Sequence, residues 1–351
     1  MLSSLAALGA TALLSIAPLV KALPLEKRVV NGPVISSNFP DPSIIRVGNT
    51  WYSFGTNSAD NGGVHVQIAK SDDFSSWTVL GKDALPNLPG WVYTANPAVW
   101  APDVIQNVCM LTSSLHPEEE ALLTQLPFQD AGKFVLYFSA SRNDKLHCTG
   151  VAIADTIEGP YTARPDPWAC PLDQGGAIDA SSFRDSDGTR YVTYKIDGNA
   201  LGGGGVCGNT EPPIRSTPIM QQKVAGNGID KIGDAYQVLD RSDADGPLVE
   251  APSIAKLPNG HYVLFFSSNC FYTIDYDVTY AIAPSVSGPY TKSGPLFVSQ
   301  GKHGFWSPGG ASISPDAKHL VFHSYNPGGS NTRAMYTSTL TWHGDVPNSE
   351  A

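Results

Sequence analysis

Glu250-Ala251-Pro252-Ser253-Ile254, which leads through a turn into Tyr262-Val263-Leu264-Phe265-Phe266, is one copy of a phrase that occurs five times in this chain. In each copy, small or acidic residues are followed by a turn and an aromatic-rich apolar strand. The other copies begin at Pro40-Asp41-Pro42-Ser43-Ile44, Ala101-Pro102-Asp103-Val104-Ile105, Ile178-Asp179-Ala180-Ser181-Ser182-Phe183 and Gly310-Ala311-Ser312-Ile313. Their strands are Trp51-Tyr52-Ser53-Phe54, Phe134-Val135-Leu136-Tyr137-Phe138, Tyr191-Val192-Thr193-Tyr194 and His319-Leu320-Val321-Phe322. Two apolar strands joined by a turn predict a β-hairpin, so we expect five hairpins.

The five copies lie at long, similar spacings. Ser43, Asp103, Ser182, Ser253 and Ser312 stand at matching places. The outer half of the unit repeats too, because Val151-Ala152-Ile153-Ala154 is matched by Tyr280-Ala281-Ile282-Ala283. Hairpins repeated at such a period indicate radial repetition, and five of them predict an all-β, five-bladed β-propeller. Equivalent strands of a propeller converge on one axis, so acids at the strand heads are expected to share one central pocket.

Composition agrees with an all-β chain. Among 351 residues there are 34 Gly and 28 Pro, and only 15% are charged, which suits short strands and tight turns. The formal net charge of −10 argues against nucleic acid or an anionic membrane as partner, because both require a basic face. A neutral polysaccharide or oligosaccharide is compatible with this charge, and we expect the protein to act on it as a monomer.

The N-terminus carries features of secretion. An apolar run from Leu5 to Val20 leads to Val20-Lys21-Ala22, which resembles a signal-peptidase site. The alternative, a membrane anchor, is disfavoured because the run is short for a membrane span. Leu25-Glu26-Lys27-Arg28 then resembles a dibasic processing site. Residues 1–28 are therefore expected to be a signal peptide with a pro-segment, and residues 29–351 a single catalytic domain that is secreted to the extracellular space.

Residues 108–129 interrupt the repeat between Ile105 and Phe134. One interpretation is a helical insertion, since long loops are thermodynamically tolerated. The other is a translated intron. Val108-Cys109 can be encoded by GTATGT, which resembles a fungal splice donor. Leu123-Thr124 can contain the branch-point pattern CTAAC, and Gln129 can be the acceptor CAG. Removal would keep the reading frame and join Asn107 to Asp130-Ala131-Gly132, a favourable hairpin turn.

The cysteine count is relevant to the same segment. Five cysteines in a secreted chain leave one unpaired, and Cys109 lies in the interrupting stretch. The other four, Cys148, Cys170, Cys207 and Cys270, predict two disulfides, for which three pairings are open.

Asp41, Asp179 and Glu250 each stand at a strand head beside small residues or proline. Acids are rarely placed at apolar strand edges without a purpose, because burying a charge is costly. Any one of them can be interpreted as a turn cap. Three at equivalent places in three blades favour a functional role. Asp103, which follows Trp100-Ala101-Pro102, is expected instead to bond backbone near the axis.

Other residues near the acids are candidates for ligand contact. Phe39, Trp100 and Trp306 flank the acid clusters and are candidates for stacking on sugar rings, with core packing between blades as the alternative. Arg333 is a candidate partner for a sugar or a carboxylate, or else a surface arginine. His303, before the fifth strand head, is a candidate ligand for an ion near the axis, for which a structural calcium is considered, or else a structural histidine.

Taken in order, these motifs resemble glycoside hydrolase family 43. They are Asp41-Pro42-Ser43, Trp100-Ala101-Pro102-Asp103-Val104, Ile178-Asp179 followed by Asp185-Ser186-Asp187-Gly188 and Tyr191, Val249-Glu250-Ala251-Pro252-Ser253-Ile254, and His303-Gly304. The resemblance covers Asn31 to about Pro347, apart from residues 108–129. It implies a five-bladed propeller that hydrolyses arabinose- or xylose-containing polysaccharides and requires no cofactor.

By the same resemblance, Asp41 is the general base, Glu250 the general acid, and Asp179 the residue that keeps the acid protonated and orients it. The chemistry of inverting hydrolysis agrees, because it requires one acid for the leaving oxygen and one opposite carboxylate that activates water. An α-L-arabinofuranosidase is the first expectation, with endo-1,5-α-L-arabinanase and β-xylosidase as alternatives. A non-catalytic carbohydrate-binding propeller is the alternative from another class, and the presence of all three acids argues against it.

Overall fold

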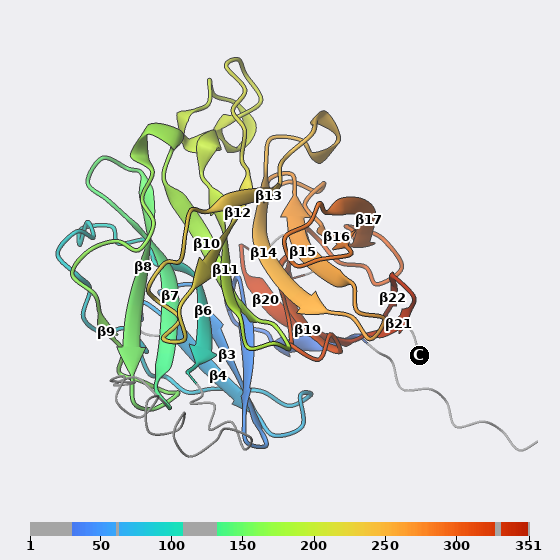
Figure 1. Cartoon of the computed structure of the whole chain (residues 1–351), viewed down its shortest axis with the longest axis horizontal. Helices are drawn as coiled ribbons and strands as arrows, with labels where there is room; N and C mark the ends of the chain where they lie inside the picture. The colour runs from blue at the N-terminus through green and yellow to red at the C-terminus, as the bar shows by residue number, and fades with distance from the viewer. Residues whose placement is uncertain (1–29, 61–62, 108–131, 327–330, 350–351) are drawn as a thin grey trace, which may run out of the picture.

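Each predicted hairpin forms the first two strands of a four-stranded antiparallel sheet in the computed structural model (Figure 1). The structure describes residues 30–60, 63–107, 132–326 and 331–349. The predictions made for residues 1–28 and 108–129 therefore lie outside the described residues. Within the described residues there are five such sheets, arranged around one axis as the blades of a β-propeller. The predicted fold class is confirmed.

The blades follow one another along the chain. Blade 1 consists of β2 (Ser43–Val47), β3 (Thr50–Gly55), β4 (Gln67–Ser71) and β5 (Thr78–Val79), and blade 2 of β6 (Trp100–Gln106), β7 (Phe134–Ser141), β8 (His147–Ala154) and β9 (Thr162–Ala163). Blade 3 consists of β10 (Ala177–Arg184), β11 (Arg190–Ile196), β12 (Ile219–Val224) and β13 (Tyr236–Leu239), and blade 4 of β14 (Val249–Lys256), β15 (Tyr262–Ser268), β16 (Val278–Ala283) and β17 (Thr291–Phe297). Blade 5 consists of β18 (Gly309–Ile313), β19 (His319–Tyr325), β20 (Arg333–Thr339) and β1 (Val30–Ile35).

The ring is closed by strand β1, which comes from the other end of the chain. It pairs antiparallel with β20, with Val30 opposite Ser338. The first and last parts of the propeller thus share one sheet, and this pairing removes two free sheet edges at once. A short hairpin follows, made of β21 (Thr341–His343) and β22 (Val346–Asn348).

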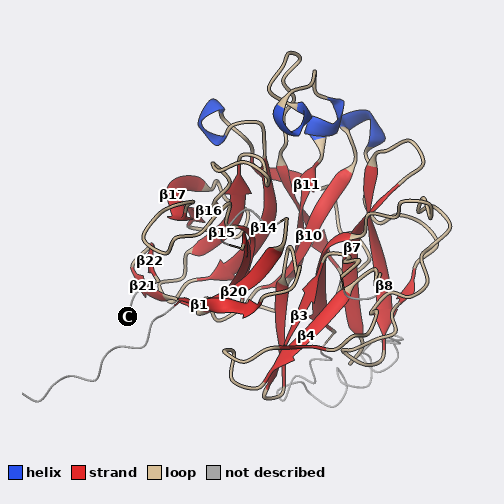
Figure 2. Cartoon of the chain, turned by 180° about the vertical axis from the view of Figure 1, so that it is seen from behind, coloured by secondary structure: helices blue, strands red, loops and turns tan. Residues whose placement is uncertain are grey.

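Short 3₁₀ helices gather at one end of the propeller (Figure 2). They are η1 (Leu172–Gln174), η2 (Gly198–Leu201), η3 (Val206–Gly208) and η4 (Asp243–Asp245). The four cysteines outside residues 108–129 form two disulfides, as expected, and the pairing is Cys148–Cys170 and Cys207–Cys270. The second joins η3 to the loop after β15. Among the described residues no helix has the length and hydropathy needed to span a membrane.

The core lies between neighbouring blades, which explains the apolar character of the inner strands. Every residue of β7, β15 and β16 is buried, because each blade is covered on both faces by its neighbours. Phe265 of blade 4 and Phe322 of blade 5, for example, belong to one buried cluster. Stacking of blades thus buries surfaces that no single hairpin could bury alone.

A kink at the head of each inner strand is the feature that positions the site. One residue per blade has a positive φ: Asp41 (50°), Ala101 (42°), Asp179 (58°), Ala251 (54°) and Gly310 (58°). In blades 2 to 5 the register of the first strand pair shifts at this point, as in a β-bulge. The kink turns two successive side chains toward the same end of the axis.

Two residues beyond each kink lies a ring of short polar side chains, and three of its members bond to a neighbouring blade. The hydroxyl of Ser312 accepts a hydrogen bond from the Ile44 amide (3.3 Å), and Ser253 accepts one from Ile313 (3.1 Å). In blade 3 the member of this ring is Ser181, two residues after Asp179, whereas the sequence comparison had matched Ser182. Blades 2, 4 and 5 contain the same bulge, so the one-residue difference comes from the two adjacent serines of blade 3, either of which matches the repeated phrase by residue type.

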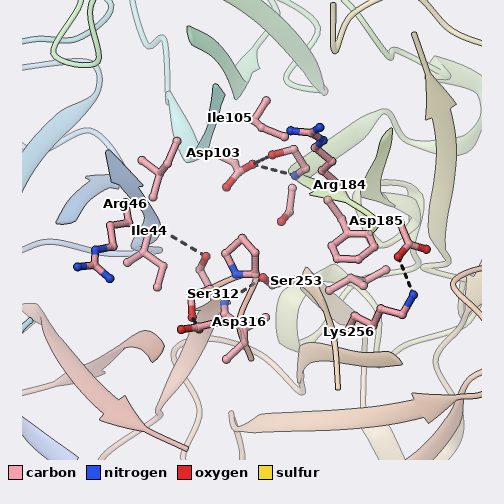
Figure 3. A pocket seen from close by; sticks show the side chains of 18 of the residues that line it. Ile44, Arg46, Asp103, Ile105, Arg184, Asp185, Ser253, Lys256, Ser312 and Asp316 are labelled. Carbon is pink, nitrogen blue, oxygen red and sulfur yellow. Dashed lines mark hydrogen bonds and ion pairs between the residues drawn. The ribbon is translucent and has the colours of Figure 1, made fainter. Parts of the chain in front are cut away.

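Asp103 is the acidic member of the ring, and its role is structural, as expected. Its Oδ2 accepts hydrogen bonds from the amide (2.8 Å) and the hydroxyl (2.6 Å) of Ser182 (Figure 3). Burial raises the pKa of Asp103 to about 6, and the bonds from Ser182 oppose that shift. The carboxyl therefore joins blade 2 to blade 3 at the axis.

Candidate active site

A cavity of about 460 Å³ lies at the end of the axis where the inner strands begin. Asp41, Asp179 and Glu250 all line it, although they come from blades 1, 3 and 4. The structure thus brings the three sequence-predicted carboxylates to one site. Residues of η2 and of the loop after β15 also line it, so the loops and 3₁₀ helices at this end form its walls.

A larger cavity, of about 710 Å³, opens where the same strands end (Figure 3). It is lined by residues farther along the inner strands, among them Ile105, Arg184 and Lys256, and by none of the three carboxylates. Lys256 is paired there with Asp185, at 3.0 Å between Nζ and Oδ1. Size alone would favour this cavity. The smaller one is the candidate active site because it holds the convergent acids.

The backbone kinks aim the acids at the cavity. Asp41 and Asp179 occupy the positive-φ position of their blades, whereas Glu250 immediately precedes that position, which Ala251 takes. The three acids are therefore not at identical places, which differs from the sequence-based expectation. A residue other than glycine that adopts a positive φ carries about 1–3 kcal/mol of backbone strain, and such strain is concentrated at functional sites. Both side chains that flank the peptide bond at the kink can reach the cavity.

Asp41 is held by donors on both carboxylate oxygens. Arg333 Nη1 lies 3.1 Å from Oδ1, and the Thr56 hydroxyl donates to Oδ2 at 2.6 Å. Burial acts to raise the pKa of Asp41, but the positive charge of Arg333 and the other contacts outweigh it and lower the pKa below its usual value. Asp41 is therefore a carboxylate at neutral pH, as activation of water requires.

His323 of β19 supports Asp41 from beneath. Its Nδ1 accepts a hydrogen bond from the Asp41 amide at 3.0 Å, which places the ring proton on Nε2. Burial lowers the pKa of His323 to about 3, so the ring is neutral near pH 7. The charge that keeps Asp41 ionised then comes from Arg333, while His323 fixes the backbone of Asp41.

Asp179 lies deep in the site, beside Glu250. Its Oδ2 accepts a hydrogen bond from the Ala251 amide at 3.0 Å, and its own amide donates to Ser139. Burial, together with the negative charge of Glu250, raises the pKa of Asp179 to about 8. Two neighbouring buried acids cannot both be ionised at low cost, so Asp179 keeps its proton near neutrality.

Glu250 is oriented by two further residues. The Tyr276 hydroxyl donates to Oε1 at 2.8 Å, and Lys195 Nζ lies 3.1 Å from Oε2. Lys195 also contacts Asp197 Oδ1 at 3.1 Å, and its side chain is 1% exposed. Burial disfavours the charged lysine, but the surrounding carboxylates outweigh burial and hold the pKa of Lys195 well above its ordinary value.

Two of the four predicted sugar-contacting residues line the cavity. Trp100 is stacked on His147, with ring centroids 4.0 Å apart, and Arg333 lies over the ring of Phe271. Phe39 differs from the expectation: its side chain is fully buried and packs on Gly55, so no ring face is turned toward a ligand. Trp306 is 42% exposed but does not line the cavity.

His303, the candidate ion ligand, lies on an exposed loop after β17. Its ring packs against Phe297 and Phe305, and it does not line the catalytic cavity. Among the described residues no group of three or more His, Cys, Asp and Glu side chains is arranged to hold a metal ion. The histidine beside the acids is His323 instead.

Sequence reasoning missed Thr56, Lys195, Tyr276 and His323. Three of these carry a signal that could have been used, because each is the polar residue that ends or breaks the aromatic strand of its repeat. Thr56 follows Phe54-Gly55, Lys195 follows Thr193-Tyr194, and His323 follows Val321-Phe322. Tyr276 lies in a loop and carries no comparable signal.

Comparison with known proteins identifies the family of this chain. The profile described as "Glycosyl hydrolases family 43" matches residues 30–347. An extracellular endo-alpha-(1->5)-L-arabinanase 1 of Bacillus subtilis is 24% identical, covering 88% of this chain and 86% of that protein. An extracellular endo-alpha-(1->5)-L-arabinanase of Thermotoga petrophila is 26% identical over 71% of this chain, which spans half of that protein's length. An extracellular exo-alpha-(1->5)-L-arabinofuranosidase ArbA of Cellvibrio japonicus is 25% identical, covering 87% of this chain and 84% of that protein.

Solved structures share the fold. The crystal structure of a thermostable family-43 glycoside hydrolase superposes with a TM-score of 0.67 at 23% identity, covering 89% of this chain and 92% of that chain. Native Bacillus subtilis arabinanase Arb43A superposes with a TM-score of 0.60 at 20% identity, covering 88% and 96%. The profile match spans nearly the whole propeller. The chain therefore belongs to glycosyl hydrolases family 43 and is a glycosidase.

Proposed function

We propose that this protein is an inverting glycosidase that acts on arabinose-containing plant polysaccharide. Asp41 is the general base that removes a proton from the attacking water. Glu250 is the general acid that protonates the leaving oxygen, and Asp179 shares a proton with it. In an inverting enzyme the base and the acid stand roughly 6.5–9.5 Å apart, which leaves room for water.

The observation that carries this proposal is the unequal environment of the carboxylates in one cavity. Asp41 is bonded to Arg333, which holds the pKa of Asp41 below its usual value, whereas burial and the charge of Glu250 raise the pKa of Asp179 to about 8. Pairs of acids whose surroundings drive their proton affinities apart are those that divide into base and acid. A purely carbohydrate-binding propeller would have no need for this division.

The substrate class is inferred from the relatives. The two with the widest coverage are named as an endo-arabinanase and an exo-arabinofuranosidase. Trp100, beside the acids, offers an aromatic face for a sugar ring, and the polar groups around it suit hydroxyls. An arabinofuranosyl residue is accordingly proposed in the subsite at Asp41 and Glu250.

Release of single terminal residues, as by an α-L-arabinofuranosidase, is the first choice. The Cys207–Cys270 disulfide joins two wall loops, and the Cys207 amide donates to the Tyr272 hydroxyl at 3.0 Å. Phe271, Tyr272, Asn199 and Ala200 line the cavity on this side. A linked wall on one side favours binding of a chain end over binding of a continuous polymer.

Internal cleavage, as by an endo-1,5-α-L-arabinanase, is the second candidate. It is favoured by the names of the Bacillus and Thermotoga relatives, which are endo-acting. A β-xylosidase activity remains a third specificity for the same catalytic groups.

The test is a screen on aryl α-L-arabinofuranoside, aryl β-D-xyloside and debranched arabinan, with product analysis. Arabinose as the sole product from debranched arabinan is expected, with inverted anomeric configuration by proton NMR in the first minutes. A ladder of arabino-oligosaccharides would replace the first choice by the second. Turnover of the xyloside alone would move the specificity to xylose, and no release from any substrate would refute the catalytic proposal.

The cellular setting belongs to the same proposal. The apolar N-terminal run, interpreted as a signal peptide, and relatives named as extracellular support secretion. The protein is proposed to act as a monomer on its polysaccharide.

A further inference from the structure

The kinks at the strand heads are supported by a repeated hydrogen bond between blades. In four of the five blades, the amide of the positive-φ residue donates to a side chain on the second strand of the preceding blade, or just after it. Thr56 accepts from Ala101 (2.9 Å), Ser139 from Asp179 (3.0 Å), Ser267 from Gly310 (3.0 Å) and His323 from Asp41 (3.0 Å). Four of the five blade junctions are built in this way.

The junction between blades 3 and 4 is the exception. Lys195 takes the acceptor position there, since it pairs with Ile178 as Ser139 pairs with Trp100 and Ser267 with Glu250. A lysine ammonium has donors only and cannot accept from the Ala251 amide. That amide donates instead to Asp179 Oδ2, at 3.0 Å.

This exceptional junction, between blades 3 and 4, lies beside the proposed general acid, Glu250. With Lys195 unable to accept, Asp179 takes over the structural bond and is thereby fixed beside Glu250, while the ammonium reaches Glu250 Oε2 at 3.1 Å. A buried cation is costly, and a serine would serve the backbone equally well, as it does in blades 2 and 4. The lysine is therefore better explained by its charge than by packing.

We propose that Lys195, balanced by Asp197, is a positioning residue that sets how tightly the Asp179–Glu250 pair holds the catalytic proton. This rests on the proposed role of Glu250 as general acid. The ammonium compensates one negative charge of the pair, and Asp197 attenuates that compensation, because Lys195 Nζ lies 3.1 Å from both acceptors. The proton is then held firmly enough to be present at working pH and loosely enough to be given to the leaving oxygen.

Other charged or titratable groups face the same site and enter the same balance. They are Asp41 before β2, Lys145 and His147 at the start of β8, Tyr276 before β16 and Arg333 of β20. Burial lowers the pKa of His147 and raises the pKa of Tyr276, so both are neutral near pH 7. Arg333 is engaged with Asp41, whereas Lys195 is in contact with Glu250.

The experiment compares the pH dependence of kcat/KM for wild type and three variants. Lys195→Ser restores the acceptor used in blades 2 and 4 and removes the charge. The basic limb of the profile, where the pair loses its proton, is expected to move up by about one pH unit or more. Asp197→Asn removes the opposing charge and should move the same limb down. Lys195→Arg keeps the charge and should leave the limb within a few tenths of a unit.

Lys256→Ser is the matched control, because it removes another lysine paired with an aspartate, at the far end of the axis. It should not move the limb. A purely structural role for Lys195 would lower activity without moving the basic limb up in Lys195→Ser and down in Asp197→Asn. An unmoved basic limb in folded Lys195→Ser, or shifts of equal sign in Lys195→Ser and Asp197→Asn, would overturn the proposal.

A second measurement is used for any variant whose turnover is too low for a pH profile. Titration of ¹³C-labelled carboxyl groups by NMR, with Glu250→Gln used to assign the Glu250 signal, reports the proton on the pair directly. Its midpoint should rise in Lys195→Ser and fall in Asp197→Asn, and unchanged midpoints would refute the inference. If Glu250→Gln itself turned over a natural oligosaccharide normally, the proposed function would fail instead, so the two failures are distinguishable.

Discussion

Trp100 and Glu250 occupy the same place in blades 2 and 4. Each immediately precedes the positive-φ residue of its inner strand, and they pair with Ser139 and Ser267, which are themselves equivalent. The kink that delivers an acid to the cavity from blade 4 thus delivers an aromatic ring from blade 2. One backbone device supplies both a catalytic group and a binding surface.

Trp100→Ala is expected to raise KM about tenfold and to change kcat little, because a stacking surface holds substrate and transition state alike. Steady-state kinetics on an arabino-oligosaccharide provides the measurement. Trp306→Ala is the control, since Trp306 is exposed and lies outside the cavity lining. Equal effects of the two substitutions would contradict the subsite at Trp100.

Glu250→Gln and Asp41→Asn should each lower kcat on a natural oligosaccharide by at least about 10²–10⁴-fold, the usual contribution of acid–base catalysis. An aryl substrate with a good leaving group needs little protonation, so it should rescue Glu250→Gln more than Asp41→Asn. The measurement is kcat of both variants on the natural oligosaccharide and on the aryl substrate. Equal rescue of the two variants would refute the assigned roles.

Arg333→Met is expected to move the acidic limb of the pH profile upward. Arg333 lowers the pKa of Asp41, and the base works only when ionised, so loss of the guanidinium means that a higher pH is needed to ionise it. The shift should be about one pH unit. Arg333→Lys should retain most of the effect, and Arg46→Met, at the other end of the axis, should have none. An unshifted acidic limb in Arg333→Met would show that Asp41 is not the group that titrates there.

Asp179→Asn should stabilise the folded protein at high pH while lowering activity. The folded-state pKa of Asp179, about 8, lies above the ordinary value of 3.8, so its stabilising contribution is complete below about pH 4 and is lost as the pH rises toward 8. The asparagine variant lacks this loss. Its free energy of unfolding relative to wild type should therefore increase between pH 4 and 8, by at least about 1 kcal/mol. Chemical denaturation at several pH values tests this, and a constant difference would contradict the buried, proton-sharing pair.

We propose that residues 108–129 are dispensable. The described residues on either side already meet as a hairpin, because the Gly132 amide donates to the Asn107 carbonyl at 2.5 Å and the Asn107 amide to Lys133 at 2.8 Å. A chain without residues 108–129 is expected to close this hairpin with a two-residue turn and to unfold at an equal or higher temperature. Thermal unfolding and activity of the two forms provide the comparison. A fall in both for the shortened chain, or transcripts that all contain the segment, would argue that it belongs to the mature protein.

The sequence by itself determined the propeller and the three acids. The nearly continuous apolar run in Tyr262-Val263-Leu264-Phe265-Phe266 and its four counterparts is a local property, and radial stacking is how repeated hairpins bury both faces. Asp41, Asp179 and Glu250 could be recognised because an acid at an apolar strand head is exceptional wherever it occurs. Closure of the ring by β1 against β20, by contrast, joins segments about 300 residues apart and left no local signal.

The tertiary structure alone decided which neighbours those acids have. Phe39 and Trp100 looked alike in sequence, yet one is in the core and the other lines the cavity. Phe39 lies in the loop before β2 and packs on Gly55, whereas Trp100 begins β6 and immediately precedes its kink. The contacts of Lys195 with Glu250, and of Arg333 with Asp41, cross from one blade to another. Electrostatic interaction depends on distance through space and on burial, and neither is encoded in the order of residues along the chain.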